Sequence, residues 1–245
     1  MIRRRMSIVL PAYDEQEGIE EQVKVALSAT ESMGFEAREV IVVDDGSSDA
    51  TGDIISRLAE EIPEVRAIHH PHNLGYADAL KSGFAAAQYE LVFYTDSDLQ
   101  FDIRELKNFL PAIDDYDLVC GFRIYRFDPL SRLFLSWGYN LLARIIFRIR
   151  VRDIDCAFKL FRREIFDRIQ IESRNFFVDT EILAKAKACG MRMTEIGVRH
   201  YPRKVGGSTV RPSHVWDTLV ELARMWHRIY VRGRGGEGAT GRGRE

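Results

Sequence analysis

Short apolar runs alternate with segments of helical periodicity over the first hundred residues. The apolar runs predict buried strands at 6–10, 39–43, 65–69 and 91–95. Between them, apolar positions three and four residues apart predict helices at 17–33, 50–61 and 75–88. Strands that alternate with helices are typical of a mainly parallel sheet with helices on its faces, so this pattern predicts an α/β fold.

The alternation becomes less regular after residue 101. Further helices are expected at 103–113, 130–147, 180–190 and 214–230, and further strands at 118–122, 158–162 and 193–201. The segment 233–245 is rich in glycine and arginine and has no apolar anchor, so we expect it to be disordered. The sequence therefore predicts one domain over residues 1–232, with halves at about 6–122 and 123–232, and a disordered tail.

The helix expected at 130–147 is apolar on nearly all sides. Arg132, Ser136 and Asn140, each four residues apart, form its polar stripe. A helix of this kind either is buried in protein or touches lipid. The basic cluster that follows suits anionic lipid headgroups and is equally compatible with a solvated turn; it comprises Arg144, Arg148, Arg150 and Arg152.

Composition limits the class of protein. The 35 lysines and arginines are offset by 37 aspartates and glutamates, which excludes a polycation built to bind nucleic acid. The three cysteines are widely spaced and form no CxxC pair, which argues against a zinc site or a disulfide framework.

The sequence also indicates where the protein acts. No secretory signal is expected, because the arginines at 3–5 precede only a short apolar strand. No run of about 18 uncharged apolar residues occurs, so no transmembrane helix is expected. We therefore expect a cytoplasmic protein that rests peripherally on the cytosolic face of a membrane. The last helix could contact the membrane, a membrane-protein partner or its own domain.

Three acidic loops follow predicted strands, at 11–15, 44–49 and 96–100. Ligands of parallel α/β sheets bind beyond the carboxyl ends of the strands. One acidic loop is explained by the preference of aspartate and serine for turns and helix caps. Three such loops at one sheet edge would repel one another unless they share a cation.

The sequence Asp96-Ser97-Asp98 is the sharpest of these signals. Two carboxylates two residues apart, directly after an apolar strand, can both turn toward one metal ion. Hard oxygen ligands suit Mg²⁺ or Mn²⁺, and the amide oxygen of Gln100 could add a third ligand. Such an ion would neutralise a diphosphate leaving group.

Seven ordered motifs resemble family 2 glycosyltransferases. IVLPAYDEQEGI, EVIVVDDGSSDAT, NLGYADALKSGF and YTDSDLQ are typical of the family in general. RDIDCAFKLFRREIF, FVDTEIL and RHYPRKVGGST resemble its polyprenyl-phosphate, dolichol-phosphate mannose synthase-like branch. The resemblance implies a GT-A fold, a GDP- or UDP-sugar donor, a divalent metal, and inverting transfer of a hexose such as mannose or glucose to a polyprenyl phosphate.

The resemblance also implies roles for individual residues. The expected donor-binding residues are Pro11, Tyr13, Glu15, Asp44, Asp45, Lys81 and Asp96, although a solvated Lys81 fits as well. The expected metal ligands are Asp96, Asp98 and Gln100, and the expected acceptor-phosphate contacts are Arg123, Arg132, Ser136 and Arg203. Asp98, Arg132 and Arg203 are the residues expected to matter most for catalysis. The sequence departs from many relatives at Ala157, where they carry glycine. The C-terminal membrane helices of many relatives are not expected here, so any lipid contact is expected to be peripheral.

An acceptor phosphate changes what catalysis requires. A sugar hydroxyl usually needs a positioned base, whereas a monoalkyl phosphate, with a second pKa of about 6, is already anionic near neutral pH. Arginine presents a fork of donors that fits a phosphate. No catalytic base is therefore assigned for the lipid-phosphate reaction.

Two alternatives remain open. A family 2 enzyme with a saccharide hydroxyl acceptor would need a base, and Asp155 is the candidate. A non-catalytic nucleotide-sugar-binding subunit is disfavoured by the intact Asp96 and Asp98 pair. A Rossmann dehydrogenase is excluded, because no G-x-G-x-x-G follows the first strand.

Overall fold

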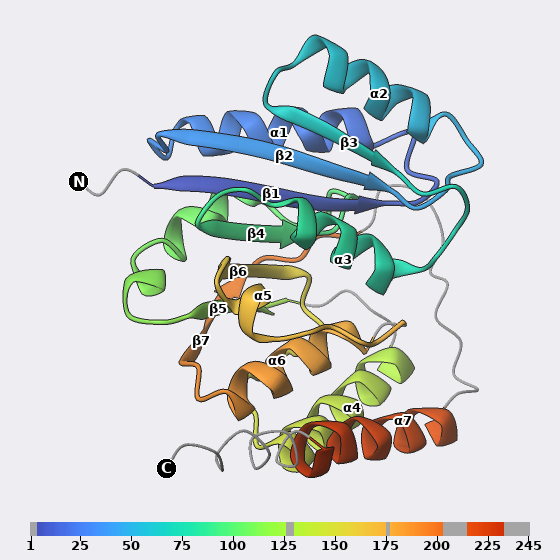
Figure 1. Ribbon diagram of the computed structural model, residues 1–245, viewed down its shortest axis with the longest axis vertical. Coiled ribbons are helices and arrows are strands. Elements are labelled where there is room, and N and C mark those ends of the chain that lie inside the picture. The colour runs from blue at the N-terminus through green and yellow to red at the C-terminus, as the bar shows by residue number, and fades with distance from the viewer. Residues whose placement is uncertain (1–3, 126–129, 175–176, 203–214, 233–245) are drawn as a thin grey trace, which may run out of the picture.

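Seven strands form one sheet in the order β3-β2-β1-β4-β6-β5-β7 (Figure 1). The computed structural model describes residues 4–125, 130–174, 177–202 and 215–232, with the backbone alone at 130–132, 134, 215–218 and 232. The strands are β1 Arg5–Ala12, β2 Ala37–Asp44, β3 Val65–His69, β4 Leu91–Thr95, β5 Leu118–Arg123, β6 Phe158–Arg162 and β7 Met193–Val198. All neighbouring pairs are parallel except those of β6, which runs antiparallel to β4 and β5.

The strand order reverses between β1 and β4. The chain runs outward from β1 through α1 (Ile19–Glu31) to β2 and through α2 (Thr51–Glu61) to β3. It then returns through α3 (Tyr76–Ala86) to β4, on the other side of β1. The right-handed crossover rule places α1 and α2 on one face and α3 on the other, as Figure 1 shows. Such a reversal point is where open α/β sheets bind ligands, at the carboxyl ends of the strands.

The second half of the chain surrounds the remaining strands with helices. They are α4 Leu130–Phe147, α5 Ile165–Arg168, α6 Val178–Ala188 and α7 Val215–His227, the last continued by the π-helical turn η4 Arg228–Arg232. Helix α4 packs against α6 and α7, and α4 and α7 lie side by side at the bottom of Figure 1. No helix in the described ranges is long and apolar enough to span a bilayer.

Most predicted elements are confirmed, and the differences have local causes. The predicted bounds of β3, β4, β6 and α4 agree with the structure, and the mainly parallel α/β sheet is confirmed. The single helix predicted at 103–113 is wrong: the structure has two 3₁₀ segments, η1 Ile103–Asn108 and η2 Ala112–Asp114. Pro111 disfavours helical backbone at the residue before it and lacks the donor that would continue the helix. The short α5 was not predicted, and the tail at 233–245 lies outside the described residues.

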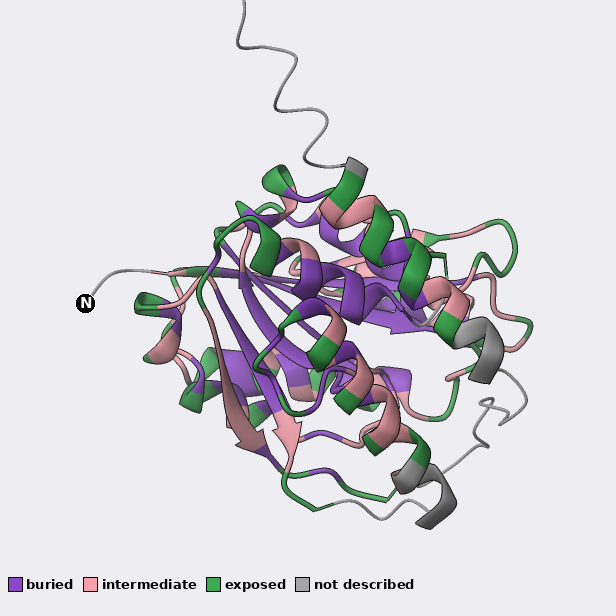
Figure 2. Cartoon of the chain, turned by 90° about the horizontal axis from the view of Figure 1, so that it is seen from below, coloured by how far each residue is buried: buried purple, intermediate pink, exposed green. Residues whose placement is uncertain are grey.

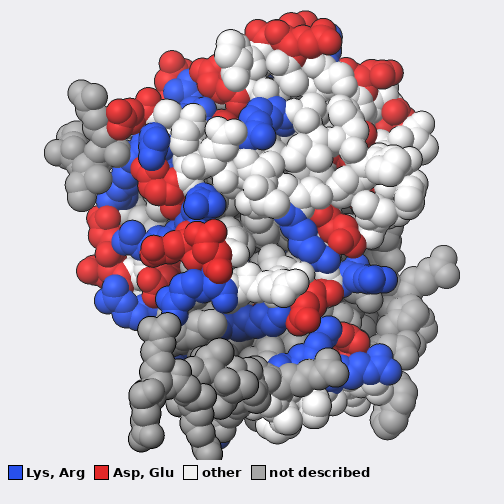
Figure 3. All heavy atoms as spheres, viewed as in Figure 1, with Lys and Arg blue, Asp and Glu red and all other residues white. Residues whose placement is uncertain are grey.

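The inner strands are mostly buried, the edge strands β3 and β7 are mostly half-buried, and the helices mix buried and exposed positions, as Figure 2 shows. Valine, isoleucine, leucine and phenylalanine dominate the strands, because parallel strands covered on both faces exclude water from successive residues. The surface in Figure 3 intersperses basic and acidic side chains. This mixed surface agrees with the near-balanced net charge and shows no single-sign field on that face.

Helix α3 approaches β1 so closely that only glycine fits at one position. A Cβ placed on Gly83 would lie 2.3 Å from Val9 Cγ1. The contact packs α3 against β1, whose carboxyl end lies beside the point where the strand order reverses. This contact therefore fixes the C-terminal part of α3 relative to β1.

Gly83→Ala should lower the free energy of unfolding by about 1–3 kcal/mol, because the added methyl overpacks the α3–β1 contact. Adding Val9→Ala removes the clashing atom, so the double variant should be more stable than the sum of the two single effects predicts. Urea denaturation would measure both. The matched control is Gly138→Ala in α4, where nothing lies within 4 Å of the added Cβ and a gain of up to about 1 kcal/mol is expected. Equal effects at the two glycines would contradict the packing argument.

Candidate active site at the carboxyl ends of the strands

The loops after β1 and β2 are tied together by hydrogen bonds. The Asp14 amide donates to Ser47 Oγ at 3.0 Å, and the Ser48 amide donates to Asp14 Oδ1 at 2.8 Å. The Glu15 amide donates to Thr51 Oγ1 at 2.8 Å. These bonds hold the first acidic loop in place, with Asp14 in the left-handed region at φ 53°. The predicted donor residues of this loop thus come from a pre-formed turn.

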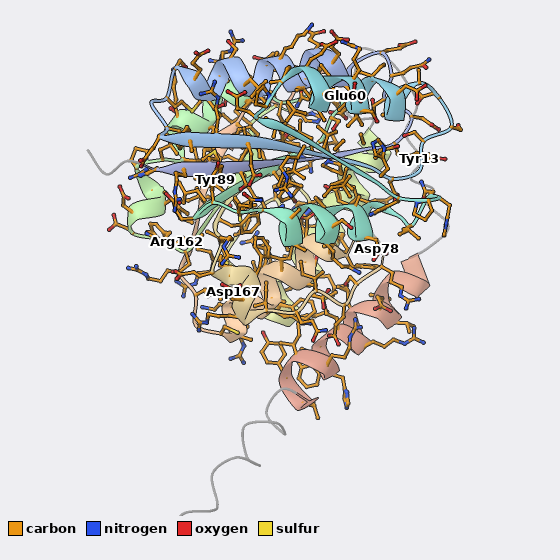
Figure 4. All side chains as sticks on the ribbon, turned by 45° about the horizontal axis from the view of Figure 1, so that its top comes forward. Tyr13, Glu60, Asp78, Tyr89, Arg162 and Asp167 are labelled. Atoms are coloured by element: carbon orange, nitrogen blue, oxygen red, sulfur yellow. The ribbon has the colours of Figure 1, made fainter. Side chains whose placement is uncertain are left out.

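The first acidic loop lies at the edge of the sheet formed by the carboxyl ends of the strands. Pro11 and Ala12 end β1 and are buried, whereas Tyr13 is 47% exposed. In Figure 4, Tyr13 lies near the carboxyl ends of the strands, and Tyr89 lies at the opposite end of the sheet. Tyr13 therefore has an exposed ring beside the point where the strand order reverses.

Asp44 is buried at the end of β2. Its Oδ1 accepts from the Ser47 amide at 2.9 Å, and its Oδ2 lies 3.1 Å from His69 Nδ1. Burial raises the pKa of Asp44, but hydrogen bonds from Ser47 and His69 outweigh burial and lower the pKa below its usual value. Asp44 is therefore an ionised carboxylate at neutral pH.

Asp45 is directed at the protein more than at solvent. Its Oδ1 lies 2.7 Å from His70 Nδ1 and accepts from the Leu74 amide, and its Oδ2 accepts from the Gly75 amide at 2.8 Å. The other ring nitrogen of His70, Nε2, lies 2.8 Å from Ser82 Oγ. Gly75 has φ +100°, a conformation that favours glycine. Asp45 therefore anchors the turn that begins α3. The sequence did not reveal the roles of His69 and His70, although both directly follow or end a predicted strand.

Asp96 and Asp98 lie in the loop after β4, at the reversal point. Asp96 Oδ1 accepts from the Tyr76 hydroxyl at 3.1 Å, and Asp98 Oδ1 accepts from the Gln100 amide at 3.1 Å. The backbone of Leu99, between Asp98 and Gln100, lies in the left-handed region at φ 58°. Burial and the charge of Asp98 raise the pKa of Asp96 to about 7.

The two carboxylates fit a divalent cation. Burial contributes most to the raised pKa of Asp96 and the charge of Asp98 adds to it, so a bound cation would stabilise the ionised form. In the described part of the chain, no cluster of three histidine, cysteine or acidic side chains forms a closed metal cage. Mg²⁺ is typically held by one or two carboxylates, with substrate phosphates and water at the other positions. The pair therefore suits an ion that arrives with a diphosphate.

Gln100 connects this loop to the end of β7. Its Nε2 donates to the Tyr201 carbonyl at 2.9 Å, and the Tyr201 amide donates to the Gln100 carbonyl at 2.8 Å. The segment that begins at Arg203 lies outside the described residues, so the expected role of Arg203 stays a prediction. The Arg132 side chain also lies outside the described part, although its backbone belongs to α4.

The remaining predicted contacts have protein partners. Lys81 Nζ lies 2.9 Å from Asp78 Oδ1, one turn earlier on α3. Arg123 forms a two-pronged ion pair with Asp153, with both nitrogen–oxygen distances at 2.7 Å. A phosphate at Arg123 would therefore share its guanidinium with Asp153.

The polar stripe of α4 joins this helix to the loop before β6. Asn140 Nδ2 donates to the Ser136 carbonyl at 2.8 Å, and Asn140 Oδ1 accepts from the Ile154 amide at 2.7 Å. The stripe is thus partly a structural lock. It holds Ser136 beside the 150–157 loop.

A groove of about 390 Å³ lies between the end of β5 and α4. Cationic and apolar side chains line it together, including Arg123, Arg144, Arg152, Ile124, Trp137 and Leu141. Helix α4 is strongly exposed on this side, with Trp137 at 61% and Ile145 at 67%, which is compatible with the lipid-facing alternative and not with burial in protein there. A larger groove of about 740 Å³ lies along α1 and contains none of the predicted site residues.

A buried ionic cluster missed by the sequence analysis lies near the end of β4. Lys159 is fully buried, and its Nζ lies 2.7 Å from Asp179 Oδ1 and 3.0 Å from the Tyr94 hydroxyl. Tyr94 in turn donates to Asp179. The lysine in the apolar strand FKLF was the signal that could have revealed this cluster, because a buried lysine requires a partner.

Asp155 occupies the loop before β6. Its Oδ1 is buried and, among the residues that the structure describes, has no hydrogen-bond partner. Burial, together with the charges of Asp179 and Asp153, raises the pKa of Asp155 to about 7. A carboxylate in this state can exchange a proton near neutral pH.

Comparison with known proteins identifies the family. The family model described as glycosyl transferase family 2 matches residues 7–170. The chain is 36% identical over 242 residues to glycosyltransferase AglD of Haloferax volcanii, covering 94% of this chain and 38% of that protein. It is 32% identical over 208 residues to the undecaprenyl-phosphate 4-deoxy-4-formamido-L-arabinose transferase of Salmonella paratyphi B, covering 84% of this chain and 62% of that protein. The chain thus spans less than two thirds of the length of either relative.

Solved structures agree on the fold. Glucosyl-3-phosphoglycerate synthase from Mycobacterium tuberculosis, in a complex with Mn²⁺, UDP-glucose and phosphoglyceric acid, superposes with a TM-score of 0.62 at 20% identity, over 92% of this chain and 79% of that chain. S. aureus TarS with UDP-GlcNAc superposes with a TM-score of 0.58 at 19% identity, over 90% of this chain and 66% of that chain. These likenesses confirm the expected GT-A fold. With the family model covering most of the chain, this protein belongs to glycosyl transferase family 2.

Proposed function

We propose that this chain is an inverting glycosyltransferase that moves a hexose, such as mannose or glucose, from a GDP- or UDP-sugar to a polyprenyl phosphate. The family membership and the Salmonella relative, which is named for transfer involving undecaprenyl phosphate, support the reaction class. The observation that carries the choice of acceptor is the groove beside α4, where arginines and exposed apolar side chains line one surface. A lipid phosphate has both of the groups that such a groove would bind.

On the donor side, the protein positions the nucleotide and its diphosphate. Tyr13 presents an exposed ring, and Asp44 presents an ionised carboxylate that could accept hydrogen bonds from base or ribose. Asp96 and Asp98 would hold a divalent cation, Mg²⁺ or Mn²⁺. When bound, the ion neutralises the charge that develops on the leaving diphosphate.

On the acceptor side, the reaction needs orientation more than proton transfer. A phosphate oxygen of the lipid attacks the anomeric carbon, the bond from that carbon to the diphosphate breaks, and the bonding electrons leave with the nucleoside diphosphate. The phosphate is already anionic, so no base is required. Arg123, Arg132, Ser136 and Arg203 are the proposed phosphate contacts. For Arg123, the Asp153 carboxylate would orient the guanidinium while a second edge contacts phosphate.

The same surface supports a peripheral membrane site. The exposed apolar residues of α4 lie beside Arg144, Arg148 and Arg150, a combination that can enter the interface and attract anionic headgroups. We therefore place the enzyme on the cytosolic face of a membrane, with α4 directed toward the lipid. A membrane-protein partner at α7 is part of the same proposal.

Asp155 favours a second candidate. Its raised pKa of about 7 and its buried oxygen suit a base that would activate a saccharide hydroxyl. Under that alternative, Asp155→Asn abolishes transfer to the sugar acceptor. Under the lipid-phosphate proposal, the same variant keeps most of its activity, because the acceptor brings its own charge.

The test is transfer of radiolabelled sugar from GDP-mannose, GDP-glucose and UDP-glucose to a short polyprenyl phosphate with Mn²⁺, with and without EDTA. We expect a labelled lipid product from one donor, and its loss on addition of EDTA. A product that resists EDTA would contradict the metal assignment. Absence of lipid product with every donor, together with metal-dependent donor hydrolysis, would reject the lipid acceptor and favour the hydroxyl acceptor.

A further inference from the structure

The Asp96 carboxylate receives a hydrogen bond from outside its own loop. The Tyr76 hydroxyl donates to Asp96 Oδ1 at 3.1 Å, from the first residue of α3 to the end of β4. The Gln22 side chain in α1 holds the same residue from another direction, because its Nε2 donates to the Asp96 carbonyl at 3.0 Å. The backbone and the side chain of Asp96 are therefore fixed by two different helices.

Tyr76 is itself held in place by the second acidic loop. Asp45 accepts from the amides of Leu74 and Gly75, the two residues before Tyr76. The left-handed Gly75 makes the turn that directs Tyr76 into the sheet. Tyr76 also packs against the hydrophobic core. Its hydroxyl therefore has a fixed position before any ligand binds.

One oxygen of Asp96 is thus occupied by Tyr76. Within the described ranges, no hydrogen bond reaches the other oxygen, Oδ2. A carboxylate rotates freely about its last bond unless a partner fixes it. The bond from Tyr76 selects one orientation, in which Oδ1 faces α3 and Oδ2 is left for another ligand.

We propose that Tyr76 is a positioning residue that orients Asp96 for the divalent cation, and that Asp45 reaches the metal site through the turn at 74–76. The inference rests on the proposed role of Asp96 as a metal ligand. In this role Tyr76 acts through the Asp96 carboxylate, to which its hydroxyl donates. Groups that orient a metal ligand typically affect metal affinity by about 10–100-fold when they are removed.

The experiment compares Tyr76→Phe with the wild-type chain by equilibrium binding of Mn²⁺ alone and of Mn²⁺ with UDP or GDP, using the electron paramagnetic resonance signal of free Mn²⁺. The variant keeps the ring and removes only the hydroxyl. We expect the Kd for Mn²⁺ to rise about tenfold. The melting temperature should stay within a few degrees of the wild type, so that lost binding is not lost folding.

Tyr89→Phe is the matched control, because Tyr89 lies at the opposite end of the sheet (Figure 4) and its ring faces the Arg5 guanidinium. Its Kd should equal that of the wild type. If Tyr76→Phe binds Mn²⁺ within twofold of the wild type, the role of Tyr76 is overturned while the metal site stands. If the wild-type chain binds no Mn²⁺ under any of these conditions, the metal site and the inference both fail. A Tyr76→Phe variant that unfolds, with Tyr89→Phe intact, also overturns the inference, because the hydroxyl would then be structural.

Discussion

Asp98→Ala is expected to lower kcat/KM for sugar transfer by at least about a thousandfold, which corresponds to roughly 4 kcal/mol of lost transition-state stabilisation. The proposed cation would lose one of two carboxylate ligands, and the diphosphate would leave without full charge neutralisation. The side chain lies in a half-buried loop and accepts a hydrogen bond from the amide of Gln100, two residues later in the chain. Its removal should therefore leave the fold intact.

Three measurements make this result specific. Steady-state kinetics at saturating metal give the loss of kcat/KM, and thermal unfolding checks the fold. Asp115→Ala, an exposed aspartate at the end of η2, should retain wild-type activity. Turnover near the wild-type rate in Asp98→Ala would remove Asp98 from the metal site. A loss of activity accompanied by a large fall in melting temperature would instead indicate a structural role.

Lys159→Met is expected to lower the free energy of unfolding by about 3–5 kcal/mol, the largest change in stability that we predict. Lys159 is fully buried, and Asp179 is 6% exposed at its side chain. Burial lowers the pKa of Lys159, but the charge and hydrogen bond of Asp179 outweigh burial and raise the pKa above its usual value. The lysine is therefore charged at neutral pH, and this stabilisation is lost only as the pH rises through the folded pKa. Removing it leaves a carboxylate buried without its counter-charge.

Urea denaturation of a double-mutant cycle separates the pair from its surroundings. Adding Asp179→Leu to Lys159→Met should restore much of the stability, because a fully apolar replacement leaves no uncompensated charge. Lys24→Ala is the control for an exposed pair, since Lys24 contacts Glu20 one turn away on the surface of α1. Its expected cost is at most about 0.5 kcal/mol. Equal losses for Lys159→Met and Lys24→Ala would contradict the buried-pair interpretation.

Local patterns predicted those elements whose limits are set by local chemistry. The apolar strand 91–95 agrees with β4, and the periodic helix 130–147 agrees with α4. The prediction of one helix at 103–113 was wrong because the apolar residues there have helical spacing, although Pro111 interrupts the helix. The exposure of α4 could not be predicted, since an apolar helix surface looks the same whether it faces protein or solvent.

The candidate site was predicted as a set of loops, and less well as a set of contacts. The acidic loops do meet at one sheet edge, because consecutive strand ends of a parallel sheet share that edge. The pairing of Asp44 with His69 follows from the register of β2 and β3, where these two residues are direct neighbours. The contact from Tyr76 to Asp96 depends on the return of the chain to the far side of β1, which the sequence alone does not show. The ion pair of Arg123 with Asp153 likewise joins residues far apart in the chain, thirty positions from each other, so the sequence alone does not show it.

The antiparallel strand β6 has a consequence for how this chain can be made and divided. The first four strands form through local crossovers, but the free side of β4 is covered only when β6 arrives from residues 158–162. Until then, β4, with the sequence LVFYT, presents unpaired amides and carbonyls along one edge, although it is fully buried in the complete fold. Such an edge is a template for pairing with another chain. During synthesis, the half at about 6–122 therefore keeps this edge unpaired until β6 is made. A fragment ending before β6 would be prone to aggregate.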